Sequence, residues 1–258
     1  MFSVVIPTLN EEVYLPRLLD SIEHQNLQPD EIIVADNHSK DRTREIARKR
    51  GCTVVDGGYL SEGRNRGAEA ATQDILVFLD ADTILPTGKF FSQLIGTFIA
   101  QEGDIGSCFA TNVKEEDPFP VPSHFFYNST KRMNTVTAKT LKRVVGELGW
   151  CVIARRSFYN KIGGFDENTR VMEDTEFFQR AVQKGGKYIV IPVHIGVSGR
   201  RFSKRNLGST LKLSALVMLM LGGMFFGWKK WRSYMKKYEA EKGALGGTNV
   251  KKRKTATN

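Results

Sequence analysis

The chain has 258 residues, 41% hydrophobic and 26% charged, a balance that allows one large or two small globular domains with a sizeable core. Three scattered cysteines argue against a disulfide framework and fit a reducing compartment. The formal charge of +10 is uneven, because residues 199–258 hold 15 Lys and Arg against 2 Asp and Glu. Such a basic segment suits nucleic acid or an anionic membrane surface. The first residues already have a strand pattern, so no secretory signal is expected.

Apolar strands alternate with amphipathic helices in the first hundred residues. We expect strands at 2–6, 31–36, 52–55 and 75–79, and helices at 11–25, 41–50, 62–72 and one capped by Thr87. After residue 105 the pattern changes to a Pro-rich loop and a basic, Thr-rich stretch, then a strand at 149–154, a turn at 163–167, a helix from 173 and a strand at 188–191 ending before Pro192. The βαβ spacing predicts an α/β fold with a parallel sheet.

The strand at 75–79 carries the clearest chemical signal. Five apolar residues indicate a strand buried on both faces, and it ends at Asp80 and Asp82. Carboxylates two residues apart on an extended chain point the same way and can share one ion, Mg²⁺ or Mn²⁺. The alternative is an ordinary carboxylate pair in a loop or at a helix N-cap.

Five patches, in order, carry a resemblance to a known family. They are Val4–Glu12, Glu31–Asp36, Gly63–Ala68, Phe78–Asp82, and Gly163–Glu167 followed by Glu173 and Asp174. Together they cover roughly residues 2–205, and the chain resembles a family 2 glycosyltransferase of the GT-A fold, of a small membrane-associated bacterial or archaeal type. The resemblance implies a Rossmann-like, mostly parallel sheet flanked by helices at 1–205. Residues 1–103 would be the nucleotide-binding half and 104–205 the acceptor half.

The same resemblance implies a nucleoside-diphosphate sugar donor, with UDP or GDP as the nucleotide. Its expected contacts are Pro7, Leu9, Glu11, Asp36, Arg64 and Asp80, with Arg200 and Arg201 either closing over the diphosphate or starting a membrane-facing patch. Glu11 has the alternative of favouring a helix N-terminus.

For the chemistry, the resemblance implies that Asp82 binds Mn²⁺ or Mg²⁺, with Asp80 on the ribose or the metal's water shell. His194 is a candidate third ligand, although a lone histidine is more often structural. Asp174, at a helix N-terminus, is the expected general base, and Glu173 is its nearest competitor. Trp150 either forms an apolar wall of the acceptor site or is a core residue. We interpret Cys151 as a packing residue.

The C-terminal part holds sixteen uncharged residues, Leu213 to Trp228, with basic residues on both sides. At 1.5 Å per residue they reach roughly 24 Å, short of the ~30 Å hydrocarbon core. An in-plane or re-entrant helix fits best, while a span of a thin bilayer and a soluble core helix stay open. We therefore predict a membrane-associated segment at 206–238, contacting lipid through 211–238, and a disordered basic tail at 239–258.

These expectations combine into one function. The sequence predicts a metal-dependent, inverting glycosyltransferase at the cytoplasmic face of the cell membrane, acting on a saccharide, lipid-linked or envelope acceptor hydroxyl. A polyprenyl-phosphate glycosyltransferase is the near alternative. A non-catalytic protein that binds nucleic acid or anionic lipid through the basic tail is the alternative of another class. Nucleic acid is not expected, because residues 1–198 are mildly acidic and show no nucleic-acid motif.

Overall fold

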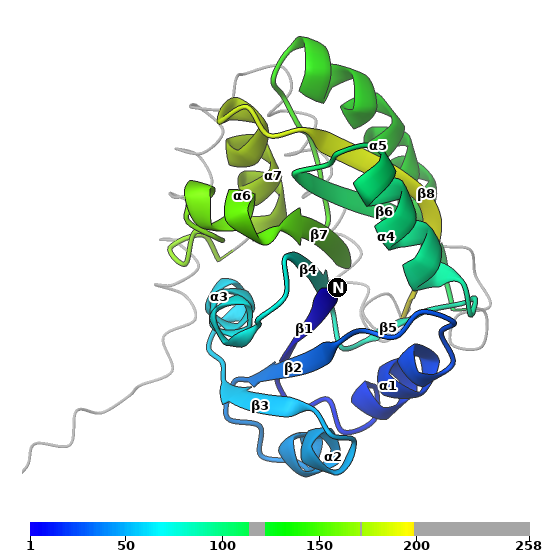
Figure 1. Ribbon diagram of the computed structural model, residues 1–258, viewed down its shortest axis with the longest axis vertical. Helices are drawn as coiled ribbons and strands as arrows, with labels where there is room; N and C mark the ends of the chain where they lie inside the picture. The colour runs from blue at the N-terminus through cyan, green and yellow to red at the C-terminus, as the bar shows by residue number, and fades with distance from the viewer. Residues whose placement is uncertain (114–121, 171, 199–258) are drawn as a thin grey trace, which may run out of the picture.

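The computed structural model describes residues 1–113, 122–170 and 172–198. Its strands join into one sheet in the order β3-β2-β1-β4-β7-β6-β8-β5 (Figure 1). The strands are β1 (Phe2–Thr8), β2 (Glu31–Asp36), β3 (Thr53–Asp56), β4 (Ile75–Leu79), β5 (Thr83–Ile84), β6 (Ile105–Asn112), β7 (Cys151–Arg155) and β8 (Tyr188–Val197). The helices are α1 (Leu15–Glu23), α2 (Thr43–Lys49), α3 (Leu60–Ala70), α4 (Phe90–Ala100), α5 (Pro122–Thr140), α6 (Arg156–Ile162) and α7 (Glu173–Gln183).

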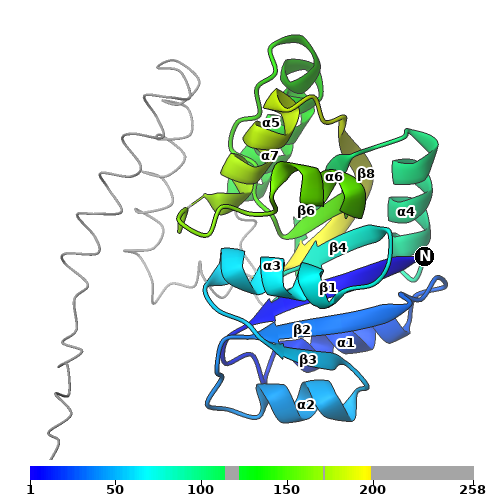
Figure 2. The same cartoon turned by 60° about the vertical axis from the view of Figure 1, so that its left-hand side comes forward.

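Most neighbouring strands of the sheet run parallel. The carboxyl ends of β1, β2 and β4, where the predicted site residues lie, are therefore at one edge of the sheet. β1 runs parallel to β2 and β4, β2 runs parallel to β3, and β6 runs parallel to β8. β7 is antiparallel to both β4 and β6, and β5 is antiparallel to β8, so the sheet is mixed. The arrows of β1 and β2 in Figure 2 point left, toward the edge where their loops gather.

Helices cover both faces of the sheet. On one face α1 and α4 bury the apolar stripes that the sequence predicts, with Leu15, Leu18, Leu19 and Ile22 from the first and Phe90, Phe91, Leu94, Ile95 and Phe98 from the second. On the other face, Phe158 of α6 and Phe177 and Phe178 of α7 belong to one buried cluster with Phe78 of β4. The α/β architecture with flanking helices is thus confirmed.

Several predicted boundaries were wrong, each for a physical reason. β1 continues through Pro7, because its pairing with β4 stops at Val5 and the missing N–H is tolerated there. β8 continues through Pro192 to Val197, because an irregularity between Cys108 and Phe109 of β6 accommodates the proline. The N-cap of α4 is Lys89, and Thr87 contributes its carbonyl to the Phe90 N–H instead.

Two helices, α5 and α6, were not predicted. α5 has little apolar periodicity, because Lys131 and Asn134 lie on its buried side. α6 is a short helix of seven residues that follows β7 directly.

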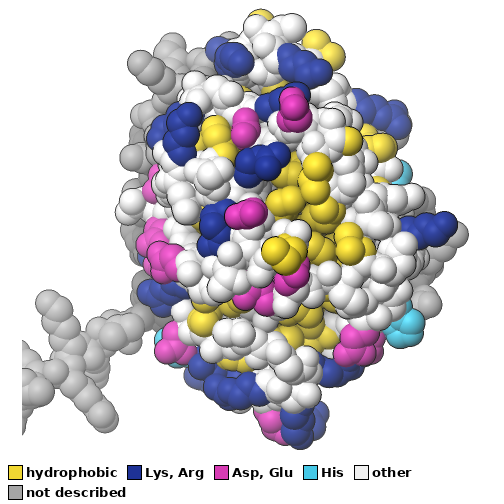
Figure 3. Space-filling model, in the orientation of Figure 1, with side chains coloured by type: hydrophobic (Ala, Val, Ile, Leu, Met, Phe, Trp, Pro, Cys, Tyr) yellow, Lys and Arg dark blue, Asp and Glu magenta, His cyan; other side chains and the backbone are white. Residues whose placement is uncertain are grey.

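The predicted segments at 206–238 and 239–258 lie outside the described residues. Within the described ranges no helix has both the length and the apolar character needed to cross a bilayer. On the face shown in Figure 3, Lys and Arg side chains are interspersed with Asp and Glu side chains around a patch of hydrophobic ones.

Candidate active site

The Asp80 and Asp82 pair lies in a turn directly after β4. The Thr83 N–H and hydroxyl both donate to the Asp80 carbonyl, at 3.1 and 2.7 Å, which closes the turn. The Asp82 carbonyl accepts the Ser198 N–H at 3.2 Å, at the end of β8. The extended geometry that the sequence suggests is therefore wrong, since the chain bends between the two carboxylates. Both residues nevertheless stand at the carboxyl edge of the sheet, where ligands bind in open α/β folds.

Arg64 of α3 draws together three carboxyl side chains from two separate segments, the turn after β4 and the start of α7. Its Nη1 donates to Glu173 Oε1 at 3.0 Å and to Asp174 Oδ1, and its Nη2 donates to Asp80 Oδ1 at 3.1 Å. The Gly149 carbonyl accepts from Nη2 at 3.3 Å. The Arg64 side chain is only 1% exposed, and these contacts occupy both of its Nη groups.

The second oxygen of Asp174 is also engaged, because Oδ2 accepts the Gly149 N–H at 2.8 Å. The Phe165 ring lies 4.9 Å from the Arg64 guanidinium carbon. Asn65, beside Arg64, accepts the Phe165 N–H at 2.9 Å and the Tyr159 hydroxyl at 2.6 Å through Oδ1. The Gly163–Glu167 turn is thereby fixed against α3.

Two groups of this cluster, Arg64 and Glu173, have shifted pKa values. Burial alone would lower the pKa of Arg64, but the neighbouring charges of Asp174, Asp80 and Glu173 raise it far above its ordinary value. Burial and the charge of Asp174 raise the pKa of Glu173 from 4.5 to about 8, against the opposing effect of Arg64. The site thus favours a protonated Glu173 near neutral pH.

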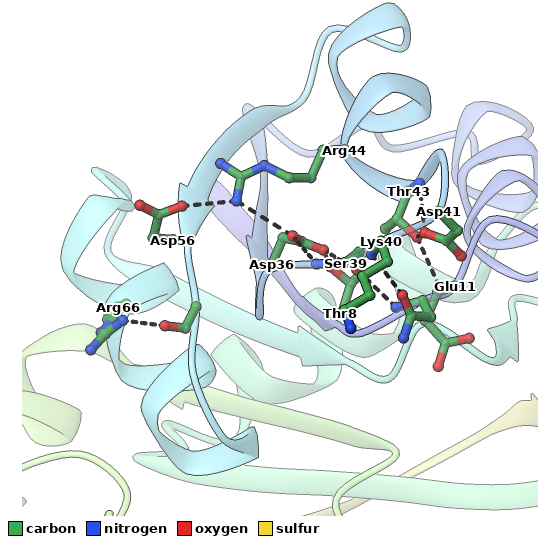
Figure 4. Close-up of polar contacts among 12 residues, drawn as sticks. Thr8, Glu11, Asp36, Ser39, Lys40, Asp41, Thr43, Arg44, Asp56 and Arg66 are labelled. Atoms are coloured by element: carbon green, nitrogen blue, oxygen red, sulfur yellow. Dashed lines mark hydrogen bonds and ion pairs between the residues drawn. The ribbon is translucent and has the colours of Figure 1, made fainter. Parts of the chain in front are cut away.

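A second polar network lies at the ends of β1 and β2 (Figure 4). The Asp36 side chain is fully buried and accepts the Thr8 hydroxyl at 3.0 Å and the Ser39 N–H at 3.0 Å. Arg44 lies 3.4 Å from Asp36 and 2.8 Å from Asp56, so it bridges the ends of β2 and β3. In this structure the Asp36 carboxylate is therefore directed to protein groups.

The loops after β1 and β2 are also joined to each other. Asn10 donates its N–H to the Ser39 hydroxyl at 2.8 Å, and Glu11 donates its N–H to the Thr43 hydroxyl at 2.8 Å. Lys40 donates its N–H back to Asn10 Oδ1 at 2.8 Å. Pro7 lies within β1 just before the first of these loops, and Leu9, the residue after β1, is half exposed. Glu11 is thus placed four residues before the first residue of α1, outside the helix.

His194 is not brought to the Asp82 turn. It lies in β8, exposed, with its ring stacked 5.4 Å from that of Phe109. Four positions separate it from Ser198, which is about 13 Å of strand. Across the described part of the chain, no three His, Cys, Asp or Glu side chains are grouped so that they could hold a metal ion. Two carboxylates in one turn still fit Mg²⁺ or Mn²⁺, because these ions commonly use one or two carboxylates and complete their coordination with water and substrate phosphates.

Trp150 directly precedes β7 and Cys151 is its first residue, beside the Asp80 turn. The Trp150 carbonyl accepts the Asp80 N–H at 3.4 Å, and its half-buried ring meets that of Tyr127 at 4.6 Å. Cys151 is buried, and a hydrogen bond with Cys108 together with burial raises the pKa of its thiol well above the ordinary value. This supports its interpretation as a packing residue. Arg200 and Arg201 lie outside the described residues.

Sequence reasoning missed the roles of Gly149, Asn65 and Phe165. Gly149 contacts both Arg64 and Asp174 through its backbone, and a Cβ at this position would lie under 3.0 Å from the Asp174 carboxylate. The glycine before Trp150 was the available signal for this close approach.

Comparisons with known proteins identify the family of the chain and support its fold. Residues 3–163 match the family model described as glycosyl transferase family 2. A 4,4'-diaponeurosporenoate glycosyltransferase of Staphylococcus haemolyticus is 38% identical over 109 residues, 39% of this chain and 29% of that protein. An O-antigen chain rhamnosyltransferase of Salmonella typhimurium is 27% identical over 197 residues, 72% of this chain and 62% of that protein. The chain therefore spans less than two thirds of these relatives.

Among solved structures, a mannosyltransferase of Pyrobaculum calidifontis in complex with GDP-Man and Mn²⁺ is similar in fold. It has a TM-score of 0.64 at 19% identity, covering 85% of this chain and 62% of that one. Glucosyl-3-phosphoglycerate synthase of Mycobacterium tuberculosis, solved with Mn²⁺ and UDP, has a TM-score of 0.54 at 22% identity, covering 86% and 78%. Since the family match covers more than half of the residues, the chain belongs to glycosyl transferase family 2.

Proposed function

We propose that the protein is a metal-dependent, inverting glycosyltransferase that moves a sugar from a UDP- or GDP-sugar to an acceptor hydroxyl. The observation that carries this proposal is the meeting of Asp80 and Asp174 on one guanidinium. The two residues come from motifs 94 positions apart. In the family pattern Asp80 acts on the donor and its metal, whereas Asp174 acts on the acceptor. Their meeting at the carboxyl edge of the sheet supports a single active centre there.

On the donor side, the nucleotide would bind over the ends of β1 and β2. Pro7, Leu9 and Glu11 would line the base and ribose, on a loop that the neighbouring loop already fixes by hydrogen bonds. Asp36 would hold Thr8 and Ser39 in place, and it would reach the base after exchanging one of these partners. Arg200 and Arg201, which follow Ser198 by two and three residues, would bind the diphosphate.

Asp82 and Asp80 would hold Mn²⁺ or Mg²⁺, which when bound supplies Lewis-acid stabilisation of the leaving nucleoside diphosphate. Two of the similar structures contain Mn²⁺, which supports this choice of metal. His194 stays a weaker candidate ligand, because it lies far along β8 from Asp82.

On the acceptor side, Asp174 would accept the proton of the attacking hydroxyl. Its two oxygens each keep a lone pair beyond the bonds from Arg64 and Gly149, so a hydroxyl has a defined direction of approach. The hydroxyl oxygen forms a bond to the anomeric carbon while the bond from that carbon to the diphosphate oxygen breaks. Attack opposite the leaving group inverts the anomeric centre.

We further propose a lipid-linked or envelope acceptor and action at the cytoplasmic face of the membrane, contacted through residues 211–238. The basic segment at 199–258 and the names of the relatives support this. The interspersed charges in Figure 3 give that face no continuous basic surface for nucleic acid.

The test is calorimetric binding of UDP and GDP, with and without Mn²⁺, to wild type and Asp82→Ala. The expected result is metal-dependent binding that Asp82→Ala abolishes. Whether UDP or GDP binds then identifies the nucleotide of the donor. Labelled donor incubated with lipid extracts then distinguishes a glycolipid hydroxyl acceptor from a polyprenyl phosphate. If folded wild type binds neither nucleotide, the proposal is wrong.

A further inference from the structure

The observed surroundings of Arg64 differ from those that its expected role requires. A donor-binding arginine needs free N–H groups that face the ligand site. Both Nη atoms of Arg64 instead donate to Asp80, Glu173, Asp174 and the Gly149 carbonyl, and the side chain is 1% exposed. We propose that Arg64 is a positioning residue, which fixes the Asp174 carboxylate relative to Asp80 and does not bind the donor. This inference rests on the proposed function.

The geometry of a guanidinium explains the choice of arginine. Its planar fork presents Nη1 to Glu173 and Asp174 of α7 and Nη2 to Asp80. One rigid group therefore sets the position of the start of α7 relative to the turn after β4. A lysine offers a single ammonium point charge on a flexible stem, which cannot reproduce both directions. Without the cation, the largely buried carboxylates of Asp80 and Asp174 would face each other beside the Glu173 carboxyl group and repel.

The backbone that carries Arg64 is itself held closely against the sheet. A Cβ on Gly63 would lie 3.3 Å from the Pro7 side chain, and one on Gly67 would overlap the Val5 side chain. Because α3 contacts β1 this closely, Arg64 approaches Asp80 from a fixed point. The Nε atom is buried and has no hydrogen-bond partner among the described residues, so the orientation of the side chain depends on its two Nη groups.

A purely structural role is the competing explanation, and the chain offers a matched control. Arg156 also has a buried nitrogen, Nη2, with no hydrogen-bond partner within the described ranges. It donates through Nε to the Gln73 carbonyl at 2.6 Å and through Nη1 to the Ala68 carbonyl at 3.2 Å. Its partners are backbone carbonyls and not carboxylates of the cluster, so its loss tests stability without removing a hydrogen bond of Asp174.

The experiment compares wild type, Arg64→Ala, Arg64→Lys, Arg156→Ala and Asp174→Asn. Binding of UDP and GDP with Mn²⁺ is measured by calorimetry. Turnover is measured as nucleoside diphosphate released from UDP-glucose, UDP-N-acetylglucosamine or GDP-mannose, with water as acceptor until a better one is known. Added guanidinium ion tests for chemical rescue, and thermal unfolding reports the folded fraction.

We expect Arg64→Ala to bind nucleotide within a few-fold of wild type and to lose on the order of 100-fold in kcat. Guanidinium should restore part of this loss in Arg64→Ala but none in Asp174→Asn. Arg64→Lys should fold and bind nucleotide but keep a reduced kcat that guanidinium does not restore. If Arg64→Ala does not fold, this lysine variant carries the test.

Two kinds of result would overturn the inference. The first is a large loss of nucleotide affinity with kcat nearly unchanged, which would make Arg64 a donor ligand. The second is either full kcat in Arg64→Lys or an equal loss of kcat in Arg156→Ala, which would reduce Arg64 to a structural role. A wild type that releases no nucleoside diphosphate from any donor is a different failure, because it contradicts the proposed function itself.

Discussion

Gly149 and Asp174 are in direct contact, since the Gly149 N–H donates to Asp174 Oδ2 at 2.8 Å and no space remains for a side chain on Gly149. We predict that Gly149→Ala displaces the carboxylate and lowers kcat by on the order of 100-fold. Gly96, exposed on α4, is the control, because a Cβ there would meet nothing within 4 Å. Gly96→Ala should raise stability by about 0.5–1 kcal/mol and leave kcat unchanged. Equal turnover in both variants would contradict the assigned role of Gly149.

Glu173 should make stability depend on pH. Its pKa is raised from 4.5 to about 8, so between these values the folded chain keeps a proton that the unfolded chain releases. The stabilisation is therefore complete below pH 4.5 and is lost as the pH rises to about 8, by up to about 1.4 kcal/mol per pH unit.

Urea unfolding of wild type and Glu173→Gln between pH 5 and 8.5 tests this prediction, because the amide removes the titrating group and should flatten the curve. Glu45→Gln, at an exposed position of α2, is the control and should leave the slope unchanged. An unchanged slope in Glu173→Gln would show that another group titrates.

Asp36 should matter for both stability and nucleotide binding. Asp36→Ala leaves the Thr8 hydroxyl and the Ser39 N–H without their buried acceptor, so we expect a loss of about 3 kcal/mol and a weaker affinity for nucleotide. Asp56→Ala removes only the exposed partner of Arg44. It should change the stability and the affinity for nucleotide far less. Chemical unfolding and calorimetry measure the two effects, and equal losses in both variants would be inconsistent with this view.

Lys131 and Glu147 form an ion pair in which both side chains are fully buried. Glu147 also accepts from Asn134 Nδ2 and the Tyr188 hydroxyl, each at 3.0 Å. Lys131→Met should cost about 3–5 kcal/mol, because it leaves a buried carboxylate without its cation.

The double variant with Glu147→Gln should recover part of that loss, since the remaining group is neutral. Denaturant unfolding with a constant m-value is the measurement. Additive losses in the double variant would argue against coupling between the two side chains.

The sequence predicted those helices and strands whose limits depend on the local pattern of apolar and charged residues. β4 has the predicted limits, because five apolar residues end at a charged one, and α7 begins at Glu173 as expected. α5 was missed because its buried side includes Lys131 and Asn134, whose polar groups hide the apolar period that marks a helix.

At the site, sequence patterns located Asp80, Asp174 and Arg64 as candidates but not their contacts with one another. Such contacts depend on how three segments pack, and nothing local in the sequence encodes that packing. The roles given to the donor-site residues, including Asp82 and His194, stay predictions.

The distance along the chain between Arg64 and its partners has a consequence for folding. Asp80 follows Arg64 by 16 residues, whereas Asp174 follows it by 110. While the chain is being synthesised, α3 and β4 are complete long before α7, and until then the guanidinium has only one of its carboxylate partners. Contacts of such long sequence separation form late and slow the folding of a domain. Burial of Arg64 therefore links completion of the fold to the arrival of α7, and chains that end before it should remain exposed to chaperones and proteases.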